Sequence, residues 1–300
     1  MAYDFVILTD DQFINPPTSE LEEAGWKEDH YLLKALEELG HRVIRKSWAD
    51  PEFDWSSCSY AIFRTTWDYF GRFAEWQTWL KKAHAQTSFI NPYPLVAWNM
   101  DKHYLGELQQ KGIRIPETRY IEKGEQVSLK ALHEQMGWQD TILKPCIAGS
   151  ARHTYRLNPE NLIDYETIFS QLIAEEAMML QPFQHHILTQ GEVSIMVIGG
   201  KFTHAVIKQA KDGDFRVQSD YGGSYSLHKP TRGEIDFAEK AIAVLEQLPA
   251  YARVDIIRDN ENRLALIEIE LIEPELWFRL YPAAATALAE HLSKTCGVNH

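Results

Sequence analysis

The stretch RLALIEIELIEP, residues 263–274, sets three glutamates into an otherwise apolar strand. Successive side chains of a strand point to opposite faces, so Glu268 and Glu270 share one face. A carboxylate buried without a partner costs several kcal/mol, and strand cores normally exclude it. The rest of the chain must therefore supply the positive charge that answers Glu268, Glu270 and Glu273.

A second strand comes just before this one. The segment YARVDIIRD, residues 251–259, runs into a turn rich in Asp and Asn, and we expect a hairpin that brings Asp255 opposite the glutamates. Three carboxylates on one sheet face repel one another unless a cation lies among them, and oxygen ligands of this kind suit Mg²⁺. Two other interpretations explain the carboxylates equally well. Lys or Arg side chains could pair with them across the sheet, or the acidic strand could be an edge strand with one face exposed to solvent.

The bulk properties exclude several classes of protein. The chain of 300 residues is long enough for two or three compact units, and its net charge of −13 argues against a nucleic-acid partner, which needs a basic surface. Cys58, Cys146 and Cys296 are far apart, which excludes a disulfide framework or a cysteine-based zinc site. The N-terminus lacks the basic region of a signal peptide, and no stretch has the length of a membrane span. We therefore expect a cytoplasmic protein without a membrane partner.

The pattern of apolar residues changes along the chain. Predicted strands and helices alternate over the first part, with a buried strand at 3–10 and helices at 20–39 and 71–84, which is typical of an open α/β sheet. The later part consists of strands joined by turns, which predicts an α+β, mostly antiparallel unit. There, Gly199 and Gly200 supply the positive φ angles of a two-residue hairpin turn.

Two further segments are compatible with a nucleotide. Lys144 ends the apolar strand TILKP and precedes a loop with Gly149 and Ser150, so it can reach a phosphate that loop amides hold. The strand MMLQPF, 178–183, stops at a proline and leaves backbone groups free to contact an adenine edge, although simple strand termination explains it as well. Neither a P-loop nor a dinucleotide fingerprint is present, so a nucleotide would need another architecture.

The order of these residues along the chain resembles the ATP-grasp superfamily, on the side that includes glutathione synthetase and D-alanine–D-alanine ligase. The segments FRTTWDY, NPYPLVAWNMDKHYL and IEIELIEP are similar to the smaller group that contains the D-cycloserine-forming synthetase. The resemblance implies an α/β and α+β fold: an ATP-grasp fold preceded by an N-terminal α/β domain. It implies three parts, an N-terminal domain at 1–95, a central ATP-grasp subdomain at 96–180 and a C-terminal subdomain with the metal-binding strands at 181–300.

The resemblance also implies roles for individual residues. Lys102 and Lys144 match the lysines that hold the ATP phosphates. Arg216 matches an arginine that approaches the γ-phosphate or the acyl phosphate, and Arg253 one that stabilises the tetrahedral intermediate. The remaining expected contacts are the adenine segment Gln181, Pro182 and Phe183, the loop residues Ser150, Ala151 and Arg152, the nucleotide contact Glu192, and the Mg²⁺ ligands Asp255, Glu268 and Glu270. Two departures from the family are EIE in place of the common EIN and a loop poorer in glycine.

The implied activity is an ATP- and Mg²⁺-dependent carboxylate–amine ligase that works through an acyl phosphate and releases ADP and phosphate. Its partners would be small-molecule carboxylate and amine substrates, amino-acid-like in kind, and a homodimer stays open. We expect Arg64 and Asp68, after one N-terminal strand, to grip a carboxylate and an ammonium, and Glu273 to organise the loop or form a salt bridge. The alternatives are a catalytically silent nucleotide-binding module and an ATP-dependent kinase of a small molecule.

Overall fold

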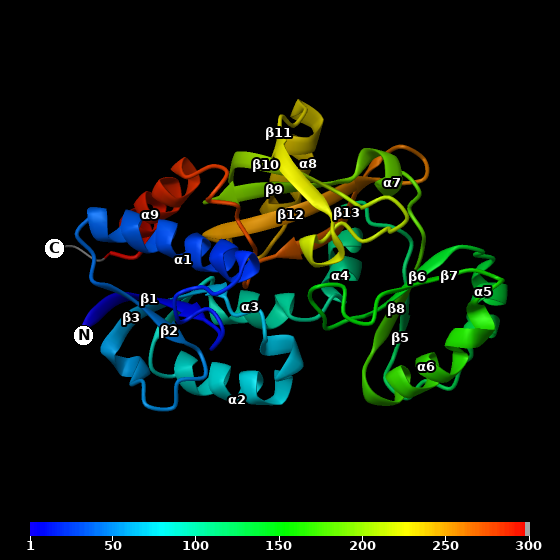
Figure 1. Ribbon diagram of the computed structural model, residues 1–300, viewed down its shortest axis with the longest axis horizontal. Helices are drawn as coiled ribbons and strands as arrows, with labels where there is room; N and C mark the ends of the chain where they lie inside the picture. The colour runs from blue at the N-terminus through cyan, green and yellow to red at the C-terminus, as the bar shows by residue number, and fades with distance from the viewer. Residues whose placement is uncertain (298–300) are drawn as a thin grey trace.

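The N-terminal part is a parallel sheet covered on both faces. The computed structural model, drawn in Figure 1, describes residues 1–297, and the strands of this sheet have the order β2-β1-β3-β4. Phe5 and Ile7 of β1 pack with α1, whereas Val6 and Leu8 pack on the opposite face with α2. The expected open α/β sheet is confirmed. Its elements are β1 (Tyr3–Thr9), α1 (Glu20–Glu38), β2 (Val43–Ser47), β3 (Cys58–Thr65), α2 (Phe73–His84) and β4 (Ser88–Ile90).

A small second sheet stands at one end of the molecule, to the right in Figure 1. Its four antiparallel strands run in the order β5-β8-β6-β7, and apolar residues of α5 and α6 form its core with them. The predicted boundary between 180 and 181 falls inside β8. The elements are β5 (Arg119–Ile121), α5 (Leu129–Met136), β6 (Thr141–Pro145), β7 (Tyr155–Leu157), α6 (Leu162–Glu175) and β8 (Met178–Pro182).

The third sheet is antiparallel, has the order β11-β10-β9-β12-β13 and carries the acidic strand. One face packs on α4 and α8; on the opposite face, Met196, Val206 and Tyr251 pack with apolar residues of α9 (Ala283–Thr295), and polar side chains such as Asp255 occupy the rest. Gly199 and Gly200 join β9 to β10 with φ angles of 54° and 79°, as the sequence predicts. The elements are α4 (Tyr104–Gln110), β9 (Glu192–Ile198), β10 (Lys201–Gln209), β11 (Ser224–His228), α8 (Arg232–Ala243), β12 (Tyr251–Arg258) and β13 (Leu264–Glu270).

Several elements differ from the sequence-based expectation. Helix α2 begins at Phe73, two residues after the predicted start at 71. Strand β11 and the helices α3 (Tyr93–Asn99), α7 (Ile187–Gln190) and α9 (Ala283–Thr295) were not expected. Helix α9 packs beside α1 at the N-terminal end of the molecule, although it lies within the third predicted part (Figure 1). The three domain ranges stay a prediction, and residues 298–300 of the last one lie outside the described residues.

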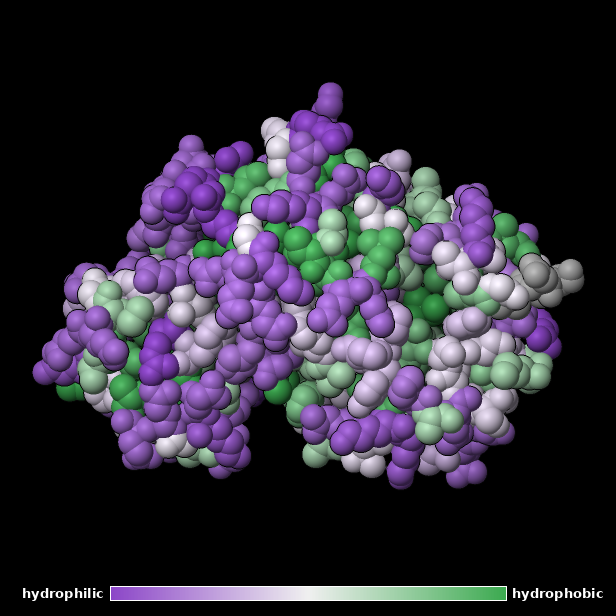
Figure 2. All heavy atoms as spheres, turned by 180° about the vertical axis from the view of Figure 1, so that it is seen from behind, coloured by the Kyte–Doolittle hydropathy of each residue, from purple (hydrophilic) through white to green (hydrophobic). Residues whose placement is uncertain are grey.

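The surface is mainly hydrophilic on the face that Figure 2 shows, with some hydrophobic residues visible in its middle. The most exposed large hydrophobic side chains of the described residues, Ile163, Met1 and Leu248, come from separate parts of the chain. Among the described residues, no helix is both long and apolar enough to cross a bilayer. The homodimer stays an open prediction.

Candidate active site

A cavity of about 860 Å³ lies where the three sheets meet. Its wall includes twelve residues predicted to bind nucleotide or metal or to act in catalysis. They come from segments up to 168 positions apart, Lys102 and Glu270 being the outermost. The set comprises Lys102, Lys144, Ser150, Gln181, Pro182, Phe183, Glu192, Arg216, Arg253, Asp255, Glu268 and Glu270. Their juxtaposition in one cavity is a property of the fold; the role of each stays a prediction.

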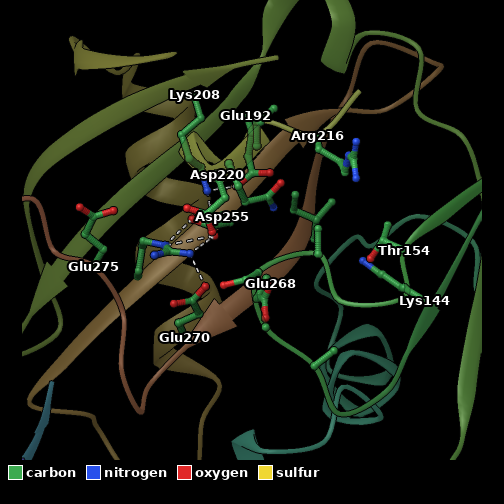
Figure 3. A pocket seen from close by; sticks show the side chains of 18 of the residues that line it. Lys144, Thr154, Glu192, Lys208, Arg216, Asp220, Asp255, Glu268, Glu270 and Glu275 are labelled. Atoms are coloured by element: carbon green, nitrogen blue, oxygen red, sulfur yellow. Dashed lines mark hydrogen bonds and ion pairs between the residues drawn. The ribbon is translucent and has the colours of Figure 1, made fainter. Parts of the chain in front are cut away.

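The acidic strand and its neighbour form the expected hairpin. In the register of β12 and β13, Asp255 lies opposite Glu268 and Arg253 opposite Glu270. One carboxylate oxygen from each of Asp255, Glu268 and Glu270 lies within 4.8 Å of the others, and Figure 3 shows the three side chains grouped together. A set of three carboxylate oxygens fits Mg²⁺, which prefers oxygen ligands and completes its shell with water or phosphate.

Basic side chains also contact these carboxylates. The Lys102 ammonium is 2.9 Å from Glu268, and the Arg253 guanidinium is 2.9 Å from Asp255 and pairs with Glu270. The Lys or Arg partners of the alternative interpretation are therefore present. They do not remove the repulsion within the cluster: burial raises the pKa of Glu270 to about 7 despite Arg253, and the charges of Glu268 and Asp255 raise it as well. A metal ion in addition to these partners is compatible with this excess of negative charge.

Glu273 lies at the edge of this cluster. Its backbone carbonyl accepts a hydrogen bond from the Trp67 indole at 2.9 Å, which fits the expected loop-organising role. Burial, and then the charge of Glu270, raises the pKa of its carboxyl to about 8. The expected salt bridge is not formed with any described residue.

Lys208 lies between two carboxylates, those of Glu192 and Asp255. It lies opposite Glu192 in the register of β9 and β10, forms an ion pair with that carboxylate and lies 3.4 Å from Asp255. Strand lysines usually face solvent, but Lys208 is only 7% exposed and lines the cavity. Ser194 donates a further hydrogen bond to Asp255 at 2.6 Å. Glu192, predicted to contact nucleotide, is thus held at the cavity wall by Lys208.

The two predicted phosphate lysines differ in their surroundings. Lys102 donates to the Ala148 carbonyl at 2.6 Å as well as pairing with Glu268. Lys144 makes no ion pair or hydrogen bond within residues 1–297, and burial lowers its pKa. Removing a cation from water costs free energy unless an anion binds it. Lys144 is therefore suited to bind a phosphate group.

The adenine segment only partly matches its prediction. The Phe183 amide donates to the Asp140 carbonyl at 2.8 Å, and the Phe183 carbonyl accepts from the Asn260 side chain. The expectation that the proline leaves the backbone groups of Phe183 free is therefore wrong. Gln181 is buried and donates to the Thr118 hydroxyl, while the Phe183 ring contributes an aromatic wall with Phe215.

The loop between β6 and β7 is folded over the cavity. A Cβ at Gly149 would lie 2.7 Å from the Phe70 ring, so this position needs glycine for a close approach. The Ser150 carbonyl accepts from the Tyr221 hydroxyl at 3.4 Å. Arg152 is not at the cavity wall: it pairs with Glu176, which corrects its expected contact with phosphate.

Arg216 projects from the loop between β10 and β11. Its guanidinium lies 3.7 Å from the centre of the Tyr221 ring and 2.7 Å from Asp214. Figure 3 shows Arg216 away from the acidic cluster and above Lys144 in that view. Together with the β6–β7 loop, these residues can enclose a polyphosphate.

The N-terminal end of the cavity differs from the prediction for Arg64. That side chain is 1% exposed, donates to the Pro274 carbonyl and does not line the cavity, so it does not grip a substrate there. Asp68 does line it and is held by the Trp48 indole and Arg72. Asp10 also lines it, and burial, then the charge of Asp68, raises its pKa to about 6.

Sequence reasoning missed the part of the wall that follows the acidic strand. Glu275, Trp277 and Arg279 line the cavity, and Arg279 pairs with Glu275 and lies 3.5 Å from Glu28. They belong to an irregular segment, where no periodicity indicates which side chains face inward. Their position just after the acidic strand is the one signal in the sequence that could have indicated them.

Comparisons with known proteins agree with this geometry. Residues 102–272, more than half of the chain, match the family described as RimK-like ATP-grasp domain. The chain belongs to this family. The predicted membership of the ATP-grasp superfamily is confirmed, and with it the expected enzyme class, the ATP-grasp ligases.

Further matches cover the N-terminal part and the whole length of the chain. Residues 5–91 match the N-terminal domain of D-cycloserine synthetase DcsG. A curated relative, the cycloserine biosynthesis protein DcsG of Streptomyces lavendulae, is 25% identical over 276 residues, which are 88% of this chain and 92% of the relative. The crystal structure of D-cycloserine synthetase DcsG has a TM-score of 0.86 at 23% identity and covers 97% of this chain and 99% of its own. A D-alanine–D-alanine ligase from Bacillus anthracis complexed with ATP has a TM-score of 0.63 at 13% identity, with 98% and 97% covered.

Proposed function

We propose that this RimK-like ATP-grasp protein joins a carboxylate to an amine through an acyl phosphate, at the expense of ATP, on a small amino-acid-like substrate. One observation carries the proposal: the three grouped carboxylates Asp255, Glu268 and Glu270 share a cavity with Lys144, a cation that has no partner among the described residues. Such a combination suits a metal–triphosphate complex, because the carboxylates can bind the metal and the lysine can bind a phosphate.

The reaction has two steps. A substrate carboxylate oxygen attacks the γ-phosphorus, and the bond to ADP breaks. The amine nitrogen then attacks the acyl carbon, loses a proton, and phosphate leaves with the former carboxylate oxygen. Neither step needs a covalent bond to the protein, so the chain contributes positioning and charge stabilisation.

Each site residue would have its own role in this reaction. Lys102 and Lys144 would hold the phosphates, with Arg216 near the transferred group. Arg253 would stabilise the negative charge that develops on the acyl carbon's oxygen. Asp255, Glu268 and Glu270 would hold Mg²⁺, which when bound would supply positive charge against the phosphates.

The amino-acid-like substrate is supported by the cavity's N-terminal end. Asp10 accepts hydrogen bonds from the amides of Gln12 and Phe13 and has no Lys or Arg partner among residues 1–297. Asp68 lies near enough to raise its pKa. An ammonium group of the substrate would neutralise Asp10, and Arg279, although paired with Glu275, adds a cation to the wall of the same cavity.

The experiment supplies the protein with Mg²⁺-ATP and amino acids whose carboxylates carry ¹⁸O. The proposal expects ADP release that depends on the amino acid, with one ¹⁸O atom transferred to phosphate. Lys144→Met should abolish the transfer, whereas Arg232→Met, at an exposed pair on α8, should leave it unchanged. A stable phosphorylated product would instead establish a kinase, and ATP binding without turnover of any amino acid would favour a silent module.

A further inference from the structure

A second cluster of metal-ligating side chains lies outside the cavity. Asp101, His103 and Cys146 each place one ligand atom within 4.8 Å of the other two. None of the three lines the cavity, although Lys102 and Lys144 beside them do. Nothing in the proposed ligase reaction uses these residues.

The donors of this cluster differ in kind from those of the acidic cluster. A thiolate, an imidazole and a carboxylate are the ligands typical of Zn²⁺, whereas Mg²⁺ prefers oxygen alone. Tetrahedral Zn²⁺ with bonds of about 2.0–2.3 Å separates its ligand atoms by roughly 3.5 Å. Small side-chain rotations would bring atoms that already lie within 4.8 Å to that spacing.

The backbone fixes two parts of the cluster relative to each other. The Lys102 amide donates to the Cys146 carbonyl at 2.9 Å, which joins the turn before α4 to the end of β6. The Cys146 amide donates to the Ala177 carbonyl, and the Cys146 side chain is 1% exposed. The His103 ring stacks on Tyr120 with the ring centres 4.5 Å apart.

His103 has a carboxylate at both ring nitrogens. Its Nδ1 lies 2.6 Å from Asp101, and its Nε2 lies 3.3 Å from Glu122 and makes no hydrogen bond with the described residues. A ligating histidine usually donates its other N–H to a carboxylate, which orients the ring. With Nδ1, the nitrogen beside Asp101, bound to the metal, Glu122 is in place to accept from the Nε2–H, and water can complete the shell.

We propose that Asp101, His103 and Cys146 form a Zn²⁺ site behind the phosphate-binding lysines, separate from the Mg²⁺ site. As the S–Zn bond forms, the Cys146 thiol loses its proton to solvent, and no electron is transferred. This site refines the sequence-based exclusion of a cysteine-based zinc site, because its three residues come from two distant segments and only one is a cysteine.

The test uses Co²⁺ as a probe, with the metal-free full-length protein in saturating Mg²⁺ and no ATP. Co²⁺ bound to a thiolate gives an intense sulfur-to-metal charge-transfer absorption, and Zn²⁺ should displace it at one equivalent. Cys146→Ser should lose the absorption, and His103→Gln should weaken Zn²⁺ binding by more than about 100-fold, since loss of an outer partner alone costs roughly 10- to 100-fold. Cys296→Ser, at another free cysteine, should behave as wild type.

Two outcomes would overturn the site: no charge-transfer absorption in the wild type, or absorption that persists in Cys146→Ser. Thermal unfolding without metal shows whether each variant is folded, and the half-exposed His103 provides a variant that does not disturb the core. Glu268→Gln should keep the absorption, because its carboxylate belongs to the other cluster. The test needs no turnover, so its failure is distinguishable from failure of the ligase proposal.

Discussion

Arg253 lies opposite Glu270 across β12 and β13, and its guanidinium also contacts Asp255 at 2.9 Å. A single buried cation thus joins two of the three carboxylates expected to hold Mg²⁺. The pairing keeps the acidic cluster stable in the absence of metal and places a cation beside the expected site of phosphoryl transfer.

Replacing Arg253 with Met should destabilise the protein. It leaves Asp255 and Glu270 without their guanidinium, and removing one partner of a buried ion pair costs about 3–5 kcal/mol. Mg²⁺ should recover part of the loss, because it neutralises the same carboxylates. Urea unfolding with and without Mg²⁺ measures both effects.

A control is available on the turn of the same hairpin. Arg263 pairs with Asp259 but is 44% exposed, so Arg263→Met should change the free energy of unfolding by less than about 1 kcal/mol. If Arg253→Met unfolds at the same urea concentration as this control, the guanidinium does not stabilise the acidic cluster.

Lys144→Met should weaken ATP binding without lowering stability. The ammonium has no partner among the described residues, and burial disfavours its charged form, so its removal takes nothing from the folded state. A lost charge-assisted contact with phosphate should lower ATP affinity about 10- to 100-fold. Calorimetry measures the ATP affinity, and thermal unfolding measures the stability. A variant that unfolds at a lower temperature than the wild type but binds ATP normally would show that Lys144 has a structural role.

The sequence could predict the acidic cluster because a hairpin register follows from alternation and a short turn. It could not place Arg64, since a position at a strand end says nothing about depth: the side chain turned out to be buried against Pro274. The sequence could not predict Arg279 either, because an irregular segment has no hydrophobic periodicity to indicate which side chains face inward. Helix α9 was overlooked although Leu288 and Leu292 have helical spacing, and its packing on α1 is a contact between distant parts of the chain.

Asp10→Asn should change how stability depends on pH. The folded-state pKa of Asp10, about 6, exceeds its ordinary value of 3.8, so the folded state binds the proton more tightly than the unfolded state does. Asp10 therefore costs the wild type stability as the pH rises from about 4 to 6, by at most about 3 kcal/mol. Asn keeps the acceptor for the amides of Gln12 and Phe13 but cannot ionise.

The variant should consequently match the wild type near pH 4 and be more stable at pH 7. Urea unfolding at a series of pH values measures the difference. A constant offset between the two proteins across this range would show that the Asp10 charge carries no such cost.

Glu270→Asn restores the residue common in the family and should keep Mg²⁺-dependent ATP binding. Asn retains one oxygen ligand, so the affinity should fall less than about tenfold, whereas Glu270→Ala removes the ligand and should lose more. Titration of Mg²⁺ at fixed ATP separates the variants. Equal affinities in wild type, Asn and Ala would exclude position 270 from the metal shell.

The central claim is that ATP binds this cavity through a metal held by the acidic strand. Calorimetric titration of ATP with and without Mg²⁺, in the wild type and in Glu268→Gln, tests it most directly. We predict binding that needs Mg²⁺ and that the substitution weakens, since Gln keeps the shape of Glu268 but not its charge. Binding that is equal in all four titrations, or absent from all four, would contradict the claim.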